Sequence, residues 1–389
     1  MGIEEMGKST GAIQQALRDI RGHGFDKSRT MPNEFYTSEE FLEYEREEIF
    51  RKEWICLGRV DELPNPGDYF TTELIDEPLI VVRGQDSKVR VLSNVCRHRS
   101  SVIAEGTGNS KHFVCPYHAW TYSDDGQLLR APYMDKVKGF KVEGCRLPAF
   151  ATEVWHGFLY VNLDGKAKPL APRLKGLEPY VRNFHMEQMV HQFINEDVWE
   201  TNWKCLTENF MEGYHLSVAH INSLHKITPT RLCEKIPGGE GYTGYKSYYV
   251  PDYPTRKPYH EDVTDDEKRY SMMFCVYPSH GVALGANGVS YKYLRPRSAD
   301  QVVLRWGYAS FNPKPKGKAI ATPTDLLNQI FVEDKERLEA LQRGLRSKFS
   351  TQSRLGPSDL EGPVWDIFQY VAQKLVRGRA KKPKLRQVS

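Results

Sequence analysis

The sequence predicts an α+β protein with two folded domains, and three observations support this. The chain has 389 residues, which is too many for one compact core. Residues 55–165 consist of short β-rich runs separated by turn signals, which indicates a small all-β module. Residues 166–389 mix helical and strand-like patterns, which indicates a larger α+β domain, and a helical segment within residues 1–54 precedes both.

Local patterns define the elements of the N-terminal half. Thr37-Ser38-Glu39-Glu40 is typical of a capping box that opens an acidic helix at roughly 38–52. Asp124-Asp125-Gly126 predicts a hairpin between 120–122 and 128–129. The β-rich runs are 69–75, 78–83, 89–92 and 154–163. A Gly/Lys/Pro stretch over 165–169 then predicts a linker between the two domains.

The second domain begins with predicted helices at roughly 173–185 and 200–220. Strands are predicted at 242–250, 270–277, 282–294 and 301–310. A long helix follows, with Thr322 at its N-cap and Pro323 at its first position. These elements predict an antiparallel sheet with helices packed on it.

Composition limits the functional classes. The chain has no apolar run near the roughly 18 residues of a membrane span and no secretory signal, so we expect no membrane role. Seven scattered cysteines do not form a disulfide framework, which favours a reducing cytoplasm. Residues 374–386 carry seven Lys or Arg and no acid, which indicates a solvated tail or a docking patch for an acidic redox partner. No nucleic-acid reading motif accompanies this charge.

Two short loops of the all-β module carry metal-ligand residues. Cys96 and His98, then Cys115 and His118, form the pattern C-x-H-x16-C-x2-H. Two thiolates on one iron and two imidazoles on the other are the ligand set of a Rieske [2Fe–2S] cluster. A structural zinc site has the same residue types, but zinc modules usually pair Cys with Cys and His with His. Because each loop supplies one Cys and one His, the spacing favours the Rieske cluster.

A second metal site is predicted in the larger domain. His215 and His220 follow Glu212, and two imidazoles with one carboxylate form the triad of non-haem Fe(II). Residues five apart lie roughly 140° apart around a regular helix, so convergence requires the helix to end or distort there. The alternative is a pair of ordinary histidines. Asp334 falls within a core-facing stripe of the late helix, which predicts either a metal ligand or a salt bridge to a residue such as Arg337.

The sequence resembles the oxygenase α subunits of Rieske non-haem iron oxygenases of the aromatic-ring-hydroxylating type. The resemblance runs from about residue 36 to 347 and rests on CRHRS, CPYHAWTY, NWKCLTENFMEGYH and VEDKERLEALQRGLRS. It implies that Cys96, His98, Cys115 and His118 bind the cluster. It also implies that His215, His220 and Asp334 bind mononuclear iron.

The resemblance has further implications. Glu212 would link a cluster histidine of one subunit to an iron-ligand histidine of the next, in a ring-shaped homotrimer. Asn209 matches a polar residue near the iron. The catalytic domain would have the helix-grip, START-like fold, with the helix near 38–52 packed on it. Glu212 and the chain length are similar to the branch that oxidises choline, glycine betaine and carnitine, although the usual Glu-Cys-Tyr-His-Cys reads Glu-Gly-Tyr-His-Leu here.

The expected activity is O2-dependent monooxygenation of a small organic substrate, by hydroxylation or oxidative N- or O-dealkylation. No Gly-rich nucleotide fingerprint follows a predicted strand, so electrons would come from a separate NAD(P)H-dependent reductase, either directly or through a ferredoxin. One alternative is hydroxylation or cis-dihydroxylation of an aromatic ring. An alternative from another class is a Rieske electron carrier or sensor without oxygenase activity.

Overall fold

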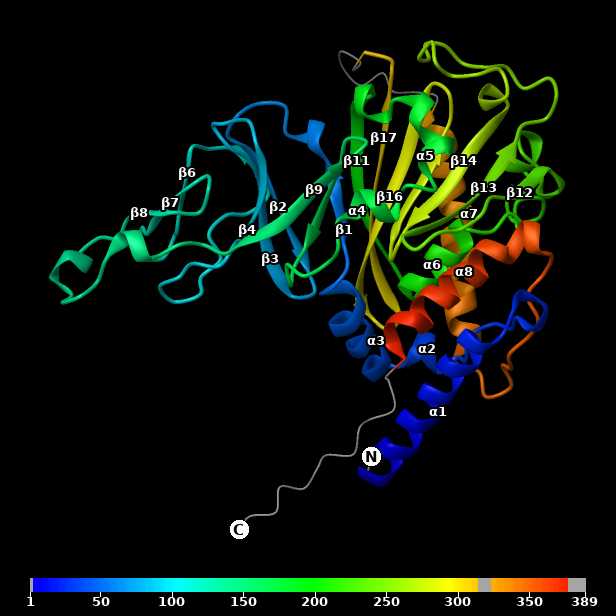
Figure 1. The fold of residues 1–389 in the computed structure, drawn as a ribbon, viewed down its shortest axis with the longest axis horizontal. Helices are drawn as coiled ribbons and strands as arrows, with labels where there is room; N and C mark the ends of the chain where they lie inside the picture. Colours follow the sequence, from blue (N-terminus) through cyan, green and yellow to red (C-terminus); the bar gives the residue numbers. More distant parts are fainter. Residues whose placement is uncertain (1–2, 314–322, 377–389) are drawn as a thin grey trace.

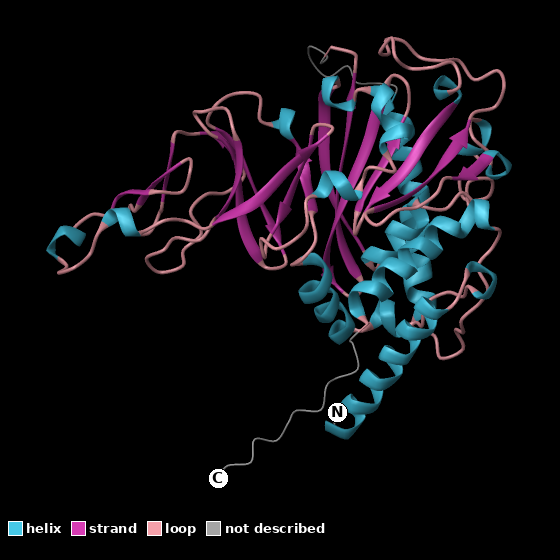
Figure 2. Ribbon diagram, in the orientation of Figure 1, coloured by secondary structure: helices cyan, strands magenta, loops and turns pink. Residues whose placement is uncertain are grey.

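The structure is a computed structural model that describes residues 3–313 and 323–376. The described strands form two seven-stranded sheets and one three-stranded sheet. The smallest sheet lies at one end of an elongated molecule, and most of the long helices gather at the other end (Figures 1 and 2). Thr322 and most of the basic stretch 374–386 lie outside the described residues.

The N-terminal half contains the first large sheet, which has the order β1-β10-β9-β4-β3-β2-β5 and antiparallel neighbours throughout. Its strands are β1 (Ile55–Arg59), β2 (Asp68–Leu74), β3 (Glu77–Arg83), β4 (Val89–Ser93), β5 (Thr107–Asn109), β9 (Ala149–Trp155) and β10 (Phe158–Asn162). The predicted single strand over 154–163 is wrong. The chain reverses at His156 and Gly157, both at positive φ, so that this segment contributes to two paired strands, β9 and β10.

The three-stranded sheet extends from this large sheet toward the end of the molecule (Figure 1). It consists of β6 (His112–Val114), β7 (Thr121–Ser123) and β8 (Leu128–Arg130). The hairpin predicted at Asp124-Asp125-Gly126 joins β7 to β8. A buried cluster that includes Ile80, Leu92, Phe113 and Tyr122 joins the small sheet to the large one.

The second large sheet belongs to the C-terminal half and has the order β11-β17-β16-β15-β14-β13-β12. Its strands are β11 (Val190–Trp199), β12 (Cys233–Lys235), β13 (Tyr242–Tyr248), β14 (Tyr270–Val276), β15 (His280–Leu284), β16 (Gly288–Ser298) and β17 (Gln301–Ser310). The predicted strand over 282–294 is two strands, because the chain turns at 285–287. The edge strand β11 escapes prediction because its polar residues give no apolar run.

The helices of the C-terminal half are α4 (Leu170–Arg173), α5 (Glu178–Val181), α6 (Trp203–Phe210), α7 (Pro323–Leu345) and α8 (Ser358–Leu375). The helix predicted over 173–185 is wrong in extent, because short helices and 3-10 turns replace it. The helix predicted over 200–220 ends at Phe210. We did not predict α8, since Gly362 and Pro363 argue against a helix, yet a buried apolar face including Ile367 and Phe368 holds it in place.

The N-terminal segment lies against the helices of the C-terminal half. It forms α1 (Ile3–Gly22), α2 (Glu34–Thr37) and α3 (Glu39–Glu45), which continues as a π-helical turn over Arg46–Phe50. The predicted capping box is wrong in detail. Ser38 is the N-cap and its hydroxyl accepts from Phe41 N at 3.2 Å, whereas the hydroxyl of Thr37 donates to Asn33 O. Gln14 Nε2 donates to Leu375 O at 3.1 Å, which joins α1 to α8.

Two buried clusters cover the two faces of the second large sheet. One cluster includes Trp203, Leu206, Phe331 and Leu338 and lies on the side of α6 and α7. The other includes Leu174, Phe184, Tyr270 and Phe274 and lies on the side of α4 and α5. This antiparallel sheet with packed helices confirms the predicted α+β class. Within the described part of the chain, no helix combines the length and apolar character needed to cross a bilayer.

Candidate metal centres

Two similar turns carry the four residues of the C-x-H-x16-C-x2-H pattern. In the first, Cys96 N donates to Ser101 O, and Ser100 N donates back to Cys96 O. In the second, Cys115 N donates to Trp120 O, and Ala119 N donates back to Cys115 O. Ser100 and Ala119 take positive φ values of 56° and 57°, which closes each turn tightly. The two turns therefore have the same backbone form, and each carries one Cys and one His.

The four side chains are arranged as two pairs. The thiols of Cys96 and Cys115 are buried and contact each other. The imidazoles of His98 and His118 lie on the solvent side, with 3.2 Å between their Nδ1 atoms. A single zinc ion would need all four ligand atoms around one point, and no three of these atoms lie within 4.8 Å of one another. A cluster with two irons fits the two pairs.

A tyrosine that the sequence analysis did not single out contacts this site. Tyr122 on β7 is fully buried, and its hydroxyl lies 3.3 Å from Cys96 Sγ. The same hydroxyl accepts a hydrogen bond from Arg97 N at 3.0 Å, so its proton is free for the sulfur. Tyr122 lies inside the CPYHAWTY motif, but its role depends on a contact across the fold that spacing does not reveal.

The second centre is formed by a turn after α6 and one face of α7. Because α6 ends at Phe210, His215 and His220 lie on turns rather than on a continuous helix, and their Nε2 atoms are 3.1 Å apart. Asp334 Oδ1 lies 3.1 Å from His220 Nε2 and 3.7 Å from His215 Nε2. The structure thus brings together the three residues predicted as iron ligands. Arg337 lies exposed, and the ion-pair contacts of Asp334 are these two histidines.

Carboxylates orient both imidazoles. Glu212 accepts from His215 Nδ1, and Glu333 accepts from His220 Nδ1 at 2.7 Å. Ser223 also donates to Glu333, at 2.5 Å. With both Nδ1 atoms held by carboxylates, the Nε2 atoms of the two rings face Asp334 and are the atoms that would be offered to a metal, as in carboxylate–histidine–metal arrangements. The sequence analysis did not predict that Glu333 orients His220. Its position directly before Asp334 in the sequence is the signal that could have indicated this role.

Asn209, the last-turn residue of α6 singled out in the sequence, reaches the same point. Its Nδ2 atom lies 3.3 Å from Asp334 Oδ1 and 3.5 Å from His215 Nε2. Burial raises the pKa of the Asp334 carboxyl, but the hydrogen bond and charge of His220 outweigh burial and lower it below its usual value. Asp334 is therefore an ionised, nearly buried carboxylate.

The three ligand atoms fit one ion. An ion about 2.1 Å from each atom would separate neighbouring ligand atoms by roughly 3.0–3.4 Å, and the observed separations are 3.1, 3.1 and 3.7 Å. Two imidazole nitrogens and one carboxylate oxygen on one side leave positions open on the other, as in non-haem Fe(II) sites. His215, His220 and Asp334 would hold a mononuclear iron.

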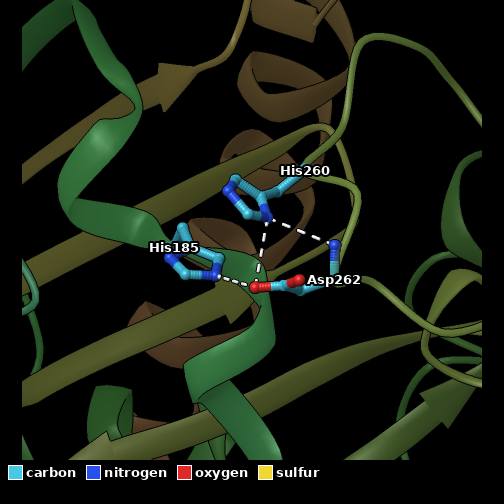
Figure 3. Close-up of side chains that lie close together, drawn as sticks. All are labelled: His185, His260 and Asp262. Atoms are coloured by element: carbon cyan, nitrogen blue, oxygen red, sulfur yellow. Dashed lines mark hydrogen bonds and ion pairs between the residues drawn. The ribbon is translucent and has the colours of Figure 1, made fainter.

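A second group of two histidines and one aspartate lies at the surface (Figure 3). His185 Nε2 lies 2.7 Å from Asp262 Oδ2, and the ring of His185 stacks on that of His260 with 3.7 Å between centroids. His260 Nδ1 already accepts from the backbone N–H of Asp262 at 3.2 Å. That lone pair is thus engaged, and the cluster is a set of ion pairs and hydrogen bonds between two loops.

Comparison with protein families matches both halves of the chain. Residues 53–141 match the Rieske [2Fe-2S] domain, and residues 179–376 match the ring-hydroxylating alpha subunit catalytic domain. The chain belongs to the ring-hydroxylating alpha-subunit family. The family resemblance predicted from the sequence is confirmed, as are a Rieske [2Fe–2S] cluster and a mononuclear iron as the cofactors of this alpha subunit.

Curated relatives of this alpha subunit carry related names. The carnitine monooxygenase oxygenase subunit of Acinetobacter baumannii is 36% identical over 200 residues, which cover 50% of this chain and 53% of that protein. The glycine betaine monooxygenase oxygenase subunit of Chromohalobacter salexigens is 34% identical over 226 residues, or 56% of this chain and 51% of that protein. The matches thus span about half the length of these relatives.

Solved structures resemble the whole alpha subunit. The quaternary ammonium Rieske monooxygenase CntA in complex with an inhibitor superposes with a TM-score of 0.79 at 25% identity, covering 93% of this chain and 98% of CntA. Naphthalene 1,2-dioxygenase from a Rhodococcus species gives the same TM-score of 0.79 at 20% identity, covering 95% of this chain and 98% of that one. The second likeness concerns the fold alone.

Proposed function

We propose that this alpha subunit is the terminal oxygenase of a multicomponent system, and that it oxidatively removes an N-alkyl group from a small quaternary ammonium compound. One observation carries the proposal: the Nε2 atoms of His215 and His220 and a carboxylate oxygen of Asp334 face one point in the catalytic half. The names of the curated relatives, a carnitine and a glycine betaine monooxygenase oxygenase subunit, support the substrate class.

The residues of the site perform defined tasks. When bound, the mononuclear iron supplies O2 activation and the Rieske cluster supplies single electrons. Glu212 and Glu333 fix the tautomers of the two iron-ligand rings, so that each ring presents Nε2. Asn209 holds Asp334 from the side of α6. Hydroxylation of an N-methyl carbon consumes one O2, two electrons and two protons, releases one water, and gives a product that loses formaldehyde.

Glu212 is the proposed link between the two centres. Its carboxylate holds His215 Nδ1 with one oxygen and accepts from the backbone N–H groups of Tyr214 and His215 with the other, and it remains 14% exposed, so a neighbouring chain can still contact it. His118 lies on the turn between β6 and β7, in the small sheet at the end of the molecule away from the long helices, which suits an approach to Glu212 of another copy in a homotrimer. Electrons enter from a separate NAD(P)H-dependent reductase, directly or through a ferredoxin, and the enzyme works in the cytoplasm.

Iron analysis and oxygen uptake test the proposal. We expect about three irons per chain, and we expect a surrogate reductase to drive O2 uptake with formaldehyde release from a quaternary ammonium compound. His215→Ala should lose one iron and all turnover while keeping the Rieske visible spectrum. Two irons per chain without O2 uptake would instead indicate an electron carrier or sensor, and one zinc would contradict both functions.

A variant of Glu212 tests the link between centres. Glu212→Ala, loaded at an iron concentration that offsets the lost contact to His215 Nδ1, should carry all three irons and the Rieske spectrum but fail to pass an electron from the reduced cluster to the mononuclear site. The measurement is a single turnover of the pre-reduced enzyme, followed by reoxidation of the Rieske absorbance. Glu208→Gln, a change four residues earlier on α6, is the control. Wild-type reoxidation in Glu212→Ala would overturn the bridging role, and light scattering tests the trimer.

A further inference from the structure

An unpaired lysine lies inside the catalytic half, on the sheet face that α6 and α7 cover. Lys292 on β16 is 3% exposed. Its Nζ lies 3.7 Å from the centroid of the Phe210 ring on α6 and 4.9 Å from that of Phe331 on α7. Within the described part of the chain, no hydrogen bond or ion pair engages this Nζ. Burying an ammonium without a counter-charge destabilises the folded protein, so a functional role would explain why this lysine is present.

Among the described residues, Asp334 is the carboxylate whose charge acts on Lys292, and the proposed iron site uses it. Asp334, on the same side of α7 as Phe331, is the acid whose charge Lys292 senses, and Trp306 is its cross-strand neighbour on β17. Burial lowers the pKa of Lys292 to about 8, and Asp334 only partly opposes this. Once iron binds, the charge of Asp334 is shared with the metal. Lys292 is then a cation without a committed partner.

A cavity opens on the sheet face to which Lys292 points, and Ser290, Arg256 and Lys268 are among its lining residues. Its volume is about 200 Å³, and its lining includes Ser271, Ala283, Ser290, Tyr308 and Leu327. Ser290 precedes Lys292 by two residues on β16, so both side chains point to the same face. Leu327 precedes Phe331 by about one turn of α7, and Asp334 follows Phe331 by about another. Lys292 is therefore two residues along β16 from the cavity lining, and its Nζ lies beside Phe331 on the helix that carries Asp334.

We propose that Lys292 determines specificity by pairing with a carboxylate of the substrate, so that this alpha subunit takes a betaine, which carries both a quaternary ammonium and a carboxylate, rather than a simple cation. This deepens the proposed function and rests on it. The carboxylate supplies the missing counter-charge, and the charge-assisted hydrogen bond orients the other end of the molecule toward His215, His220 and Asp334. A cation without a carboxylate, such as choline, meets electrostatic repulsion from Lys292.

The competing explanation is structural, because an ammonium over two aromatic rings is also a cation–π contact. The chain offers a control, a second lysine over an aromatic ring that differs from Lys292 in having an ion pair, with Asp266 at 3.7 Å. Lys246 on β13 places its Nζ 4.6 Å from the centroid of the Tyr270 ring, on the opposite face of the same sheet. If aromatic contact explains both lysines, Lys292→Met and Lys246→Met should affect ligand binding alike.

The test measures ligand binding to the iron-loaded full chain by calorimetry without O2 or reductase. The probes are two pairs that share a skeleton and differ in the carboxylate: glycine betaine with choline, and benzoate with benzyl alcohol. We expect the wild type to prefer the acid of at least one pair, and Lys292→Met to weaken that acid about 10- to 100-fold with little change for the alcohol. Lys292→Arg should retain the preference, and Lys246→Met should behave as wild type.

The outcomes separate this inference from the proposed function. A Lys292-dependent preference for benzoate, with no binding of glycine betaine, would keep the carboxylate inference and reject the quaternary ammonium substrate. Binding of neither acid, or an equal loss of acid and alcohol in Lys292→Met, would overturn the inference. The iron content of each variant shows whether it folds, and the Lys292→Arg protein keeps the test valid if the Met variant does not.

Discussion

Glu333 accepts a hydrogen bond from Nδ1 of His220 at 2.7 Å, while the next residue, Asp334, lies 3.1 Å from Nε2 of the same ring. Two successive residues of α7 thus hold opposite edges of one imidazole. The His220 ring is itself 1% exposed, so water cannot replace either contact easily. Glu333 fixes which nitrogen of His220 faces the metal.

We expect Glu333→Gln to weaken iron binding about 10- to 100-fold, which is the usual cost of losing the partner of a metal-bound histidine. Glu336→Gln, at an exposed position of the same helix, is the control. Calorimetric titration of iron into the metal-depleted protein measures the difference. Equal affinities in the two variants would show that the Glu333 contact does not orient His220.

Tyr122→Phe should lower the reduction potential of the Rieske cluster. Its hydroxyl lies 3.3 Å from Cys96 Sγ, and a hydrogen bond to a ligand sulfur stabilises the reduced, more negative cluster. Spectroelectrochemical titration measures the potential. Tyr117→Phe is the control, because the exposed Tyr117 lies in the same motif and its hydroxyl accepts from Arg99 instead of contacting a thiol. A potential that is unchanged in Tyr122→Phe but shifted in Tyr117→Phe would reverse this assignment.

Lys204→Met should destabilise the protein by about 3–5 kcal/mol, because it leaves the carboxylate of Glu45 buried without its partner. Both side chains are 0% exposed, and Nζ of Lys204 lies 2.8 Å from Glu45 Oε1. The double variant Glu45→Gln/Lys204→Met should lose less, since neither charge remains. The midpoint of urea denaturation measures the effect. Lys52→Met removes an exposed pair with Glu48 and should cost under about 1 kcal/mol.

The stability that His156 provides should decline as pH rises above neutrality. Burial lowers the pKa of His156, but hydrogen bonds to Glu178 at 3.1 Å and Glu187 at 3.0 Å outweigh it and raise the pKa above its usual value. A histidine whose pKa is raised in the folded state stabilises that state fully at pH values below the unfolded-state pKa of about 6.5. This stabilisation is lost as the pH rises through the folded-state pKa. Because both acids are partly exposed, we expect about 1 kcal/mol.

Thermal unfolding at pH 6 and pH 8 measures this contribution. The difference between wild type and His156→Gln should be larger at pH 6 and should shrink at pH 8. A constant difference across that range would mean that the charge of His156 does not matter. The contact joins the β9–β10 turn to α5, so it also connects the two halves of the chain.

The residues proposed as metal ligands could be singled out because their signals are local or periodic. Cys96, His98, Cys115 and His118 follow a fixed spacing, and Asp334 lies in an apolar stripe where an acid is unusual. Tyr122, Glu333 and Lys292 were not found, because each acts through a contact between segments distant in sequence. The sequence contains one weak indication of the role of Lys292, which is the only charged residue among 282–294.

The secondary-structure elements were likewise predictable where the signal is local and not where it depends on tertiary contacts. Strands with clear apolar runs, such as β3 and β17, lie where the sequence indicates. The edge strand β11 and the helix α8 depend on their neighbours, because one is polar and the other contains Gly362 and Pro363. Tertiary packing overrides local preference in both.

The turn after α6 contacts the helix α7 through His215, His220 and Asp334. An ion held there cross-links two segments far apart in the sequence, and it stabilises the native state because the unfolded chain cannot offer the same three atoms together. Loss of iron therefore also removes a cross-link that stabilises the folded state. A molecule that releases its iron opens more readily to proteases, which couples the working lifetime of the catalyst to the supply of the metal.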